Sequence, residues 1–298
     1  MADAVAARER GALPARPARR FSTAWLGLVP FFLFSIAFMF LPALYLFVGS
    51  FQKDDQFTLQ NYADLQTGII PGAFLLSIEI SLVTAIAGGI FGFMLAYAVI
   101  MGGLPGFLRT AVMTFSGVAS NFAGVPLALA FIFTLGQLGV LTVFLRGLGF
   151  DLYSGNFRLT GKLGLEIVYL YFQIPLMVLI IAPAIDGLKK EWREAAENMG
   201  ATPSQYWRRV ALPILTPSIL GTMVLLFGNS FGAQATAYQF TGGTLNIVTL
   251  VISSQIRGDV LHNPGLGFAA AMGMVVIMGI SIGLYTVLQR RAERWLRS

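Results

Sequence analysis

The sequence predicts an all-α membrane protein with six transmembrane helices, and two observations support this. Of the 298 residues, 56% are hydrophobic and only 11% are charged, with a mean hydropathy of +0.73. In a soluble domain about a quarter of the residues are charged. Several apolar stretches also reach the roughly 20 residues that a helix needs to cross the hydrocarbon core of a bilayer. A soluble globular fold is therefore excluded.

The first stretch, residues 1–23, is rich in Ala, Arg and Pro and has no apolar period, so we expect a disordered cytoplasmic arm. A signal peptide is the alternative, because a basic segment precedes an apolar one. The apolar stretch Trp25–Gly49 is too long for a cleavable core of about 7 to 15 residues, and no small-residue cleavage pattern follows it. We therefore expect it to remain as the first span of a transmembrane domain over residues 24–298.

Five more stretches qualify as spans by length and apolar content: Phe74–Met101, Phe107–Leu135, Leu165–Ile185, Ile214–Ala237 and Leu266–Leu288. Prolines lie in or near most of them, which membrane helices tolerate when neighbouring groups bind the freed carbonyls. We expect kinks, particularly at Gly124–Pro126.

The basic residues predict the orientation, since cytoplasmic loops carry an excess of Lys and Arg. With the N-terminus inside, fifteen of the twenty basic residues fall on the inner side. The outer side holds the other five: Lys53, Arg146, Arg158, Lys162 and Arg257. Both termini are therefore predicted to be cytoplasmic.

Composition also limits the chemistry. The chain has no cysteine and one histidine, His262, which excludes thiolate and His-rich metal sites, so we expect no metal and no cofactor on this chain. The net charge of +6 is spread over the ends and short loops, so nucleic acid is not an expected partner.

The second inner loop, residues 187–212, holds the one sizeable charged island of the chain. Trp192, Ala195, Ala196 and Met199 have the spacing of one helix face, so a short amphipathic helix is expected. Gly200 suits the position after its last turn, where a left-handed backbone is needed. Lys189, Arg193 and Glu197 follow each other four apart on another face and can pair.

A second short helix is predicted after Gly200. Thr202-Pro203-Ser204-Gln205 has the form of a capping box with proline at the first helical position. Pro213 and Pro217 then open the fifth span. The resulting knob could dock another protein or lie on lipid headgroups, and Glu194 argues against lipid because anionic lipids repel carboxylates.

These residues resemble a known signature. Glu194-Ala195-Ala196, three residues, Gly200, nine residues, Val210, one residue and Leu212-Pro213 are similar to the EAA motif of permease subunits of bacterial binding-protein-dependent ABC importers. Family members usually have isoleucine where this chain has Val210. The resemblance covers roughly residue 74 to the C-terminus and implies a type I importer permease (MetI-like) bundle with a cytoplasmic coupling helix.

The resemblance implies that Glu194, Ala195, Ala196 and Gly200 dock on an ATP-hydrolysing subunit, and that Pro213 helps to set the entry to the fifth helix. It also implies two ATPase subunits, a second permease that is usually a different chain, a periplasmic or lipid-anchored substrate-binding protein, and transport by alternating access in the bacterial inner membrane. The chain itself lacks a G-x-x-x-x-G-K-[ST] phosphate loop, so ATP and Mg are expected on the partner ATPase and this chain is expected not to be an enzyme.

The region from Phe227 to Tyr238, with Thr241-Gly242-Gly243 and residues 255–260, looks similar to the spermidine and putrescine branch of these permeases. That branch also includes relatives for iron, thiamine, phosphonates and other solutes. A polyamine such as spermidine or putrescine is the expected substrate, with those solutes or a sugar as alternatives.

A cationic solute would favour carboxylates or aromatic rings along its path. The candidate pathway residues are Glu79, Tyr169, Asn229 and Gln234, the last two expected in helix five. An ionisable group at membrane depth is a functional hypothesis by default, although Glu79 could also reach water or be neutralised by a neighbouring helix. Glu166 opens helix four, where a carboxylate suits the helix N-terminus without any further role. Asn229 and Gln234 could simply bond across helices.

Two other functional classes fit less well. An ion-coupled secondary transporter is expected to show internal repeats and broken helices, and the two halves have no clear repeat. An intramembrane enzyme would need a cluster of catalytic groups within the spans, which the sequence does not offer.

Overall fold

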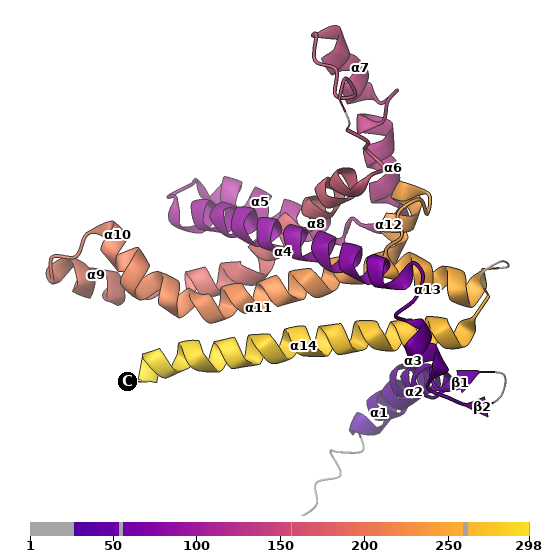
Figure 1. Cartoon of the computed structure of the whole chain (residues 1–298). Helices are drawn as coiled ribbons and strands as arrows, with labels where there is room; N and C mark the ends of the chain where they lie inside the picture. The colour runs from indigo at the N-terminus through magenta and orange to yellow at the C-terminus, as the bar shows by residue number, and fades with distance from the viewer. Residues whose placement is uncertain (1–26, 54–55, 156, 259–261, 298) are drawn as a thin grey trace, which may run out of the picture. The chain divides into compact units, whose positions relative to one another are not determined.

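The computed structural model describes residues 27–53, 56–155, 157–258 and 262–297, and the side chains up to residue 290. The predicted arm, residues 1–23, lies outside this part of the chain. The structure divides into two units, one ending at Tyr45 and one from Leu46 onward. Figure 1 shows that the described part of each unit consists almost entirely of helices.

The described part of the first unit is one apolar helix that continues past the boundary at Tyr45. It comprises α1 (Val29–Ser35), the π-helical turn η2 (Ile36–Phe40) and α2 (Leu41–Gly49). The Leu41 N–H donates to the carbonyl of Ile36, five residues back. This wider turn precedes Pro42, whose ring would clash with a carbonyl of the preceding turn in a regular α-helix.

In the second unit, the end of α2 is followed by a short ribbon of β1 (Gln52–Lys53) and β2 (Gln56–Phe57), which pair antiparallel with Gln52 opposite Phe57. The helices that follow are α3 (Gln60–Asp64), α4 (Ile70–Met101), α5 (Gly106–Asn121), α6 (Gly124–Leu135), α7 (Val140–Gly147), α8 (Lys162–Asp186), α9 (Lys190–Asn198), α10 (Pro203–Tyr206), the π turn η3 (Trp207–Ala211), α11 (Leu212–Phe231), α12 (Gln234–Thr241), α13 (Val248–Arg257) and α14 (Pro264–Arg297).

Helix α8 is the centre of this unit and packs against α4, α5 and α11. Its side chains Val168, Met177 and Ile181 are fully buried. At Gly92 of α4, an added Cβ would lie 2.5 Å from the Cβ of Met177, so only glycine permits this approach of the two helices. At one end of the pair, the Arg109 guanidinium donates to Asp186 at 2.6 Å and joins α5 to α8.

Six helices in the described residues are long and apolar enough to cross a membrane, which confirms the predicted number. They are Val29–Gly49, Ile70–Met101, Gly124–Gly147, Lys162–Asp186, Pro203–Phe231 and Pro264–Arg290.

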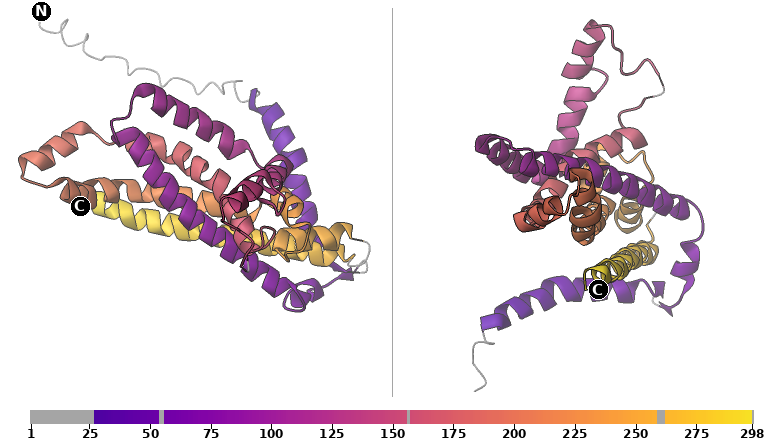
Figure 2. Two further views of the ribbon diagram at one scale, coloured as in Figure 1. Left: turned by 90° about the horizontal axis from the view of Figure 1, so that it is seen from above. Right: turned by 90° about the vertical axis from the view of Figure 1, so that its left-hand side faces the viewer.

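The prediction of the third span as one helix over Phe107–Leu135 is wrong. Helix α5 ends at Asn121 and α6 begins at Gly124, whose φ of +71° cannot continue a right-handed helix. Pro126 then lies in the first turn of α6, where its missing N–H costs little. The kink expected at Gly124–Pro126 is therefore a complete break, after which α6 and α7 leave the direction of α4, α8 and α11 (Figure 2).

The fifth span also differs from its prediction. The short helix that starts at Pro203 does not stop before Pro213 but continues through η3 into α11 as one helix to Phe231. As before Pro42, a π turn precedes the proline, and the Leu212 N–H donates to the carbonyl of Trp207. Gln234 was expected within this helix, but Gly232 and Ala233 interrupt it and Gln234 is the first residue of α12.

Candidate functional site

Helix α9 forms the predicted amphipathic helix of the charged loop, and its end is fixed by backbone hydrogen bonds. Glu191 lies in its first turn, where a carboxylate suits the helix dipole. At its C-terminus, the Ala201 N–H donates to the carbonyl of Ala196 at 2.9 Å and the Gly200 N–H to that of Glu197 at 2.9 Å. This pair of bonds is the Schellman arrangement, and Gly200 supplies the left-handed residue with φ +79°. The predicted left-handed turn at Gly200 is confirmed.

The predicted capping box at Thr202 is also present. The Gln205 N–H donates to the Thr202 hydroxyl at 3.3 Å, and the Thr202 N–H donates to the Gln205 side-chain carbonyl at 2.8 Å. The C-terminus of α9 and the N-terminus of α10 are therefore both capped by hydrogen bonds between near neighbours. The segment from α9 to α10 thus has a defined shape even without contacts to distant parts of the chain. We call residues 190–206 the docking knob.

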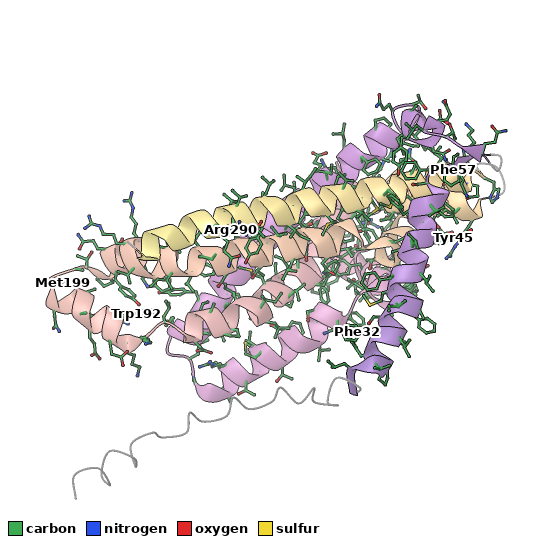
Figure 3. The ribbon with its side chains drawn as sticks, turned by 90° about the horizontal axis from the view of Figure 1, so that it is seen from below. Phe32, Tyr45, Phe57, Trp192, Met199 and Arg290 are labelled. Carbon is green, nitrogen blue, oxygen red and sulfur yellow. The ribbon has the colours of Figure 1, made fainter. Side chains whose placement is uncertain are left out.

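The apolar face of the docking knob is mostly uncovered. Trp192 and Met199 are 37% and 82% exposed, whereas Ala196 is only 4% exposed and belongs to the buried cluster of Leu188 and Tyr206. Figure 3 shows Trp192 and Met199 at one end of the second unit and Phe57 at the opposite end.

The expected docking residues differ in exposure. The side chain of Ala196 is buried in its own chain, while Glu194, Ala195, Gly200 and Pro213 are exposed. Ala195 and Ala196 are adjacent and so lie 100° apart on the helix, which puts one outside and one inside.

Side-chain contacts hold the docking knob to the bundle. The Arg193 guanidinium donates to Glu197 at 2.8 Å, and this hydrogen bond raises the arginine pKa further. Lys189 does not join the predicted row of charges but lies 5.8 Å from the centre of the Trp192 ring. Directly after the knob, the rings of Trp207 in η3 and Tyr97 of α4 meet edge to face with centroids 4.7 Å apart, which anchors this segment to the membrane helices.

At the other end of α11, two interrupted helices meet. The N–H of Gly124, at the start of α6, donates to the hydroxyl of Thr236 in α12 at 2.7 Å. A cavity of about 270 Å³ lies between these helix starts and is lined by Asn229, Gln234 and Ser120, among others. We call it the inner cavity.

A larger cavity adjoins it. This open cavity of about 790 Å³ lies between α12, α13 and the start of α4, and its polar lining consists of Gln234, Tyr238, Asn246, Ser253, Ser254 and Arg257. Gln234 and Ala235 line both spaces. We call this larger space the mouth cavity, since it lies at the end of α11 remote from the docking knob (Figure 1).

Glu79, a candidate pathway residue, is paired. Its carboxylate accepts a hydrogen bond from the ammonium of Lys162, the first residue of α8, and its side chain is about half exposed. Glu166 lies one turn further along α8 and is buried. The carboxylate of Glu79 is therefore neutralised by a neighbouring helix, which is the structural alternative that the sequence left open.

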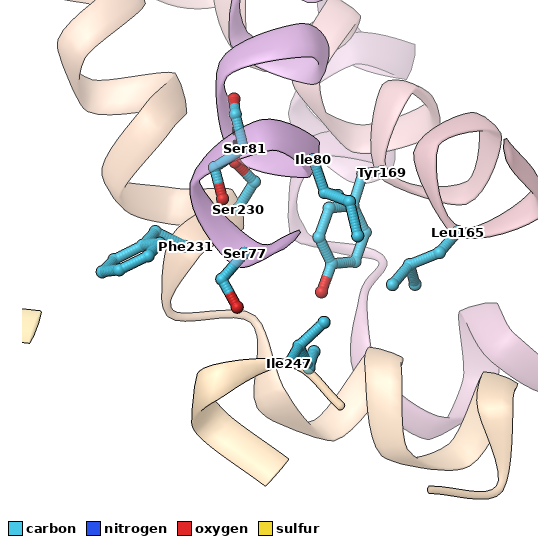
Figure 4. Close-up of a pocket in the computed structure, with 8 residues that line it drawn as sticks. All are labelled: Ser77, Ile80, Ser81, Leu165, Tyr169, Ser230, Phe231 and Ile247. Atoms are coloured by element: carbon cyan, nitrogen blue, oxygen red, sulfur yellow. Dashed lines mark hydrogen bonds between the residues drawn. The ribbon is translucent and has the colours of Figure 1, made fainter. Parts of the chain in front are cut away.

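Tyr169 faces the packed interior. Its ring is 2% exposed, its hydroxyl donates to the carbonyl of Ala233 at 2.8 Å, and it lines a void of about 10 Å³ with Ser77, Ser81 and Ser230 (Figure 4). Such a void has room for about one water molecule. Tyr169 thus fixes the break between α11 and α12 and does not offer a ring face to a solute.

Of the two amides, Asn229 donates to the side-chain carbonyl of Gln173 at 3.5 Å and also borders the inner cavity, while Gln234 is exposed to both cavities.

The sequence interpretation missed Thr236 and Arg257 as lining residues. Thr236 has no distinguishing local pattern. Arg257 was counted only as an outer charge, although it is one of few charges beyond the fifth span.

Known proteins match the chain at the level of sequence and fold. The family described as "Binding-protein-dependent transport system inner membrane component" matches residues 88–294. The chain is 27% identical over 256 residues to the "Probable sulfate transport system permease protein cysT" of Helicosporidium sp. subsp. Simulium jonesii, covering 85% of this chain and 89% of that protein. It is 28% identical over 245 residues to the "Sulfate transport system permease protein CysT" of Salmonella typhimurium, covering 80% and 84%.

A further relative is named for the solute expected from the sequence. The "Spermidine/putrescine transport system permease protein PotB" of Haemophilus influenzae is 29% identical over 164 residues, covering 53% of this chain and 56% of that protein. Among solved structures, a chain of a bacterial ABC transporter "involved in the import of the acidic polysaccharide alginate" matches with a TM-score of 0.71 at 18% identity, covering 90% of this chain and 95% of that chain. That likeness supports the fold.

Proposed function

The chain belongs to the family of binding-protein-dependent transport system inner membrane components, and from this premise we propose that the docking knob couples it to an ATPase while a solute moves through the opposite end. As a member of this family it is a transport permease of an ABC importer and not the catalytic subunit. The observation that carries the proposal is the uncovered face of the knob around Glu194, Ala195 and Met199.

The coupling role rests on shape and exposure. A rigid protrusion with exposed Trp192 and Met199 beside exposed Glu194 suits a protein groove better than a lipid surface, because its carboxylates would face anionic headgroups. Motion of the ATPase would pass through α10 and η3 into α11, which are one continuous helix. A stiff lever of this kind transmits displacement to the break at Gly232.

Permeases of this family work with ATPase subunits, a second permease and a periplasmic binding protein, in a multi-pass inner-membrane assembly. We propose that the second permease is a different chain, that two ATPase subunits supply ATP and Mg chemistry, that transport proceeds by alternating access, and that both termini are cytoplasmic. The excess of basic residues on the knob side supports that orientation.

For the substrate we propose a small oxyanion of the sulfate type in place of the polyamine expected from the sequence. Several relatives that cover most of this chain are named for sulfate, one that covers 88% of it is named for trehalose, and the relative named for spermidine and putrescine covers about half of it. Among the described residues, no carboxylate lines either cavity. A desolvated polyamine favours carboxylates or aromatic rings, and of these the described lining offers the rings of Tyr238 and Phe172, whereas amides and an arginine suit an anion. A polyamine remains the second candidate because of the PotB match.

The test is uptake by the complete importer reconstituted in vesicles with its ATPase, second permease and binding protein. We expect ATP-dependent accumulation of radiolabelled sulfate that excess spermidine does not reduce. Accumulation of labelled spermidine without sulfate would reject the oxyanion and leave the importer role intact. Uptake of either solute by this chain alone, without ATP, would reject the importer role and favour a secondary transporter.

A further inference from the structure

The mouth cavity has a distinctive charge pattern. Among the described residues that line it, Arg257 is the only charged one, and Gln234, Asn246 and Ser253 supply uncharged polar groups. The guanidinium has no described carboxylate within 4 Å. Among the described groups, the guanidinium is the one full charge in this space of about 790 Å³, and it contributes a positive potential there.

The described lining of the inner cavity likewise contains no carboxylate. Gln234 and Ala235 connect the mouth cavity to the inner cavity, where the helix starts at Gly124 and Gln234 lie. Helix starts carry partial positive charge, since their first N–H groups lack helical acceptors. From Arg257 to Asn229, a solute therefore meets one full positive charge, then partial positive charges and neutral amides.

A simpler role for Arg257 is the stabilisation of its own helix. It is the last residue of α13, where a cation interacts favourably with the helix dipole. That role would act equally well with the side chain turned to bulk water and would not require it to line a cavity. It also predicts that loss of the charge affects only the stability of α13, which makes the two roles distinguishable.

We propose that the mouth cavity is the entry site for the solute and that Arg257 is the residue that selects a small oxyanion there. The inference rests on the proposed function and names the residue behind its substrate class. Arginine suits this task because its planar group binds two oxygens of a tetrahedral anion at once and stays charged at all relevant pH values. The inner cavity, about 270 Å³, then receives the ion with part of its water.

The absence of native cysteine allows a direct test. Ser253 lies in the mouth cavity one helical turn before Arg257, on the same face of α13. In the complete importer carrying Ser253→Cys, we would measure the modification rates by an anionic and a cationic methanethiosulfonate of similar size. We expect the anionic reagent to be favoured, and Arg257→Gln to lower the ratio of the two rates about tenfold, since the reagents differ by two charges.

Control variants separate the effect of the Arg257 charge from any effect of the substitution on the fold. Arg257→Lys should keep most of the ratio, and Arg158→Gln, which removes another exposed outer arginine outside the cavity, should leave it unchanged. Sulfate should slow modification of the cysteine in the presence of Arg257 and not in Arg257→Gln. A ratio that stays the same in Arg257→Gln would overturn the inference.

The outcomes also separate this inference from the proposed function. If sulfate is imported with ATP but Arg257→Gln changes neither the ratio nor the protection, the inference fails and the importer stands. If spermidine protects the cysteine and sulfate does not, the oxyanion is wrong, and the role of Arg257 in selecting it is wrong as well.

Discussion

The docking knob and the mouth cavity differ in how their structure is determined. The knob is closed by bonds between near neighbours, such as Ala201 to Ala196 and Thr202 with Gln205. The cavity end depends on bonds between distant segments, such as Gly124 to Thr236, 112 residues apart, and Tyr169 to Ala233. The docking knob is therefore locally rigid, whereas the cavity end changes shape whenever the helices around it move.

This difference suits two separate tasks, the transfer of force from a partner and the passage of a solute. A surface that must pass force from a partner benefits from local rigidity, because a soft contact would absorb the displacement. A solute site that must open and close benefits from contacts between separate helices, since small helix shifts alter them. The helix Pro203–Phe231 joins the end of the docking knob to the break at Gly232 beside the inner cavity.

The largest effect is expected at Glu194. Glu194→Arg reverses an exposed charge on the docking knob and should lower ATP-driven uptake at least about tenfold, as for the loss of a central interface residue. Glu194→Asp should retain most of the activity. The measurement is uptake per ATPase turnover in vesicles, with membrane insertion checked by protease protection. Normal uptake by Glu194→Arg would remove the knob from the coupling role.

A substitution at Gly200 should act through the backbone alone. No atom lies within 4 Å of a Cβ added there, yet φ is +79°, so Gly200→Ala should destabilise the end of α9 by about 1–2 kcal/mol. Asparagine tolerates this conformation better and should cost less. Hydrogen exchange of the amides of Gly200 and Ala201 would report the change.

Gly187 provides the matched control, because its φ of −73° is ordinary and its nearest contacts are 3.4 Å away. Gly187→Ala should leave exchange in α9 within experimental scatter. Equal effects of the two alanines would mean that the left-handed turn does not determine the shape of the docking knob.

Thr236 tests the distant bonds at the cavity end. Thr236→Val keeps the volume but leaves the N–H of Gly124 without its acceptor, at a cost of about 1–3 kcal/mol. Thr236→Ser keeps the hydroxyl and should behave as the parent. Thermal unfolding in detergent measures the stability, and labelling of Ser253→Cys measures the cavity. A valine variant as stable as the serine variant would show that this bond does not hold the two helix starts together.

The smallest effect is expected at Asp64 near the ribbon. Hydrogen bonds from Gln60 at 2.7 Å and Lys53 at 3.1 Å hold the pKa of Asp64 below its ordinary value. The stabilisation is therefore complete above the ordinary pKa of 3.8 and is lost as the pH falls through the lower folded value. Hydrogen exchange of α3 should increase over that acidic range in the parent and not in Asp64→Asn. The same acid response in Asp64→Asn would assign it to another group.

The sequence predicted features that depend on near neighbours. The six spans follow from apolar length, and the turn at Gly200 and the capping box at Thr202 follow from residue preferences at helix ends. The break near Gly124 was anticipated as a kink. Its full extent was not, because a helix break at membrane depth requires distant partners, here Thr236, that spacing does not reveal.

Side-chain roles were harder to predict for the same reason. Ala196, one of the expected docking residues, is buried in the same hydrophobic cluster of its own chain as Leu188 and Tyr206. Glu79 is paired with Lys162, which lies 83 positions later in the chain. Both outcomes depend on how helices cross, and a single sequence without its fold does not contain that geometry.

The most direct test of the account asks whether the two ends communicate. In the assembled importer carrying Ser253→Cys, the rate of modification in the mouth cavity would be compared without nucleotide and with the ATPase held by ATP and vanadate. We expect the nucleotide to change this rate severalfold in the parent and to have no effect when Glu194→Arg is added. The same nucleotide response with and without Glu194→Arg would contradict the claim that the docking knob drives the mouth cavity.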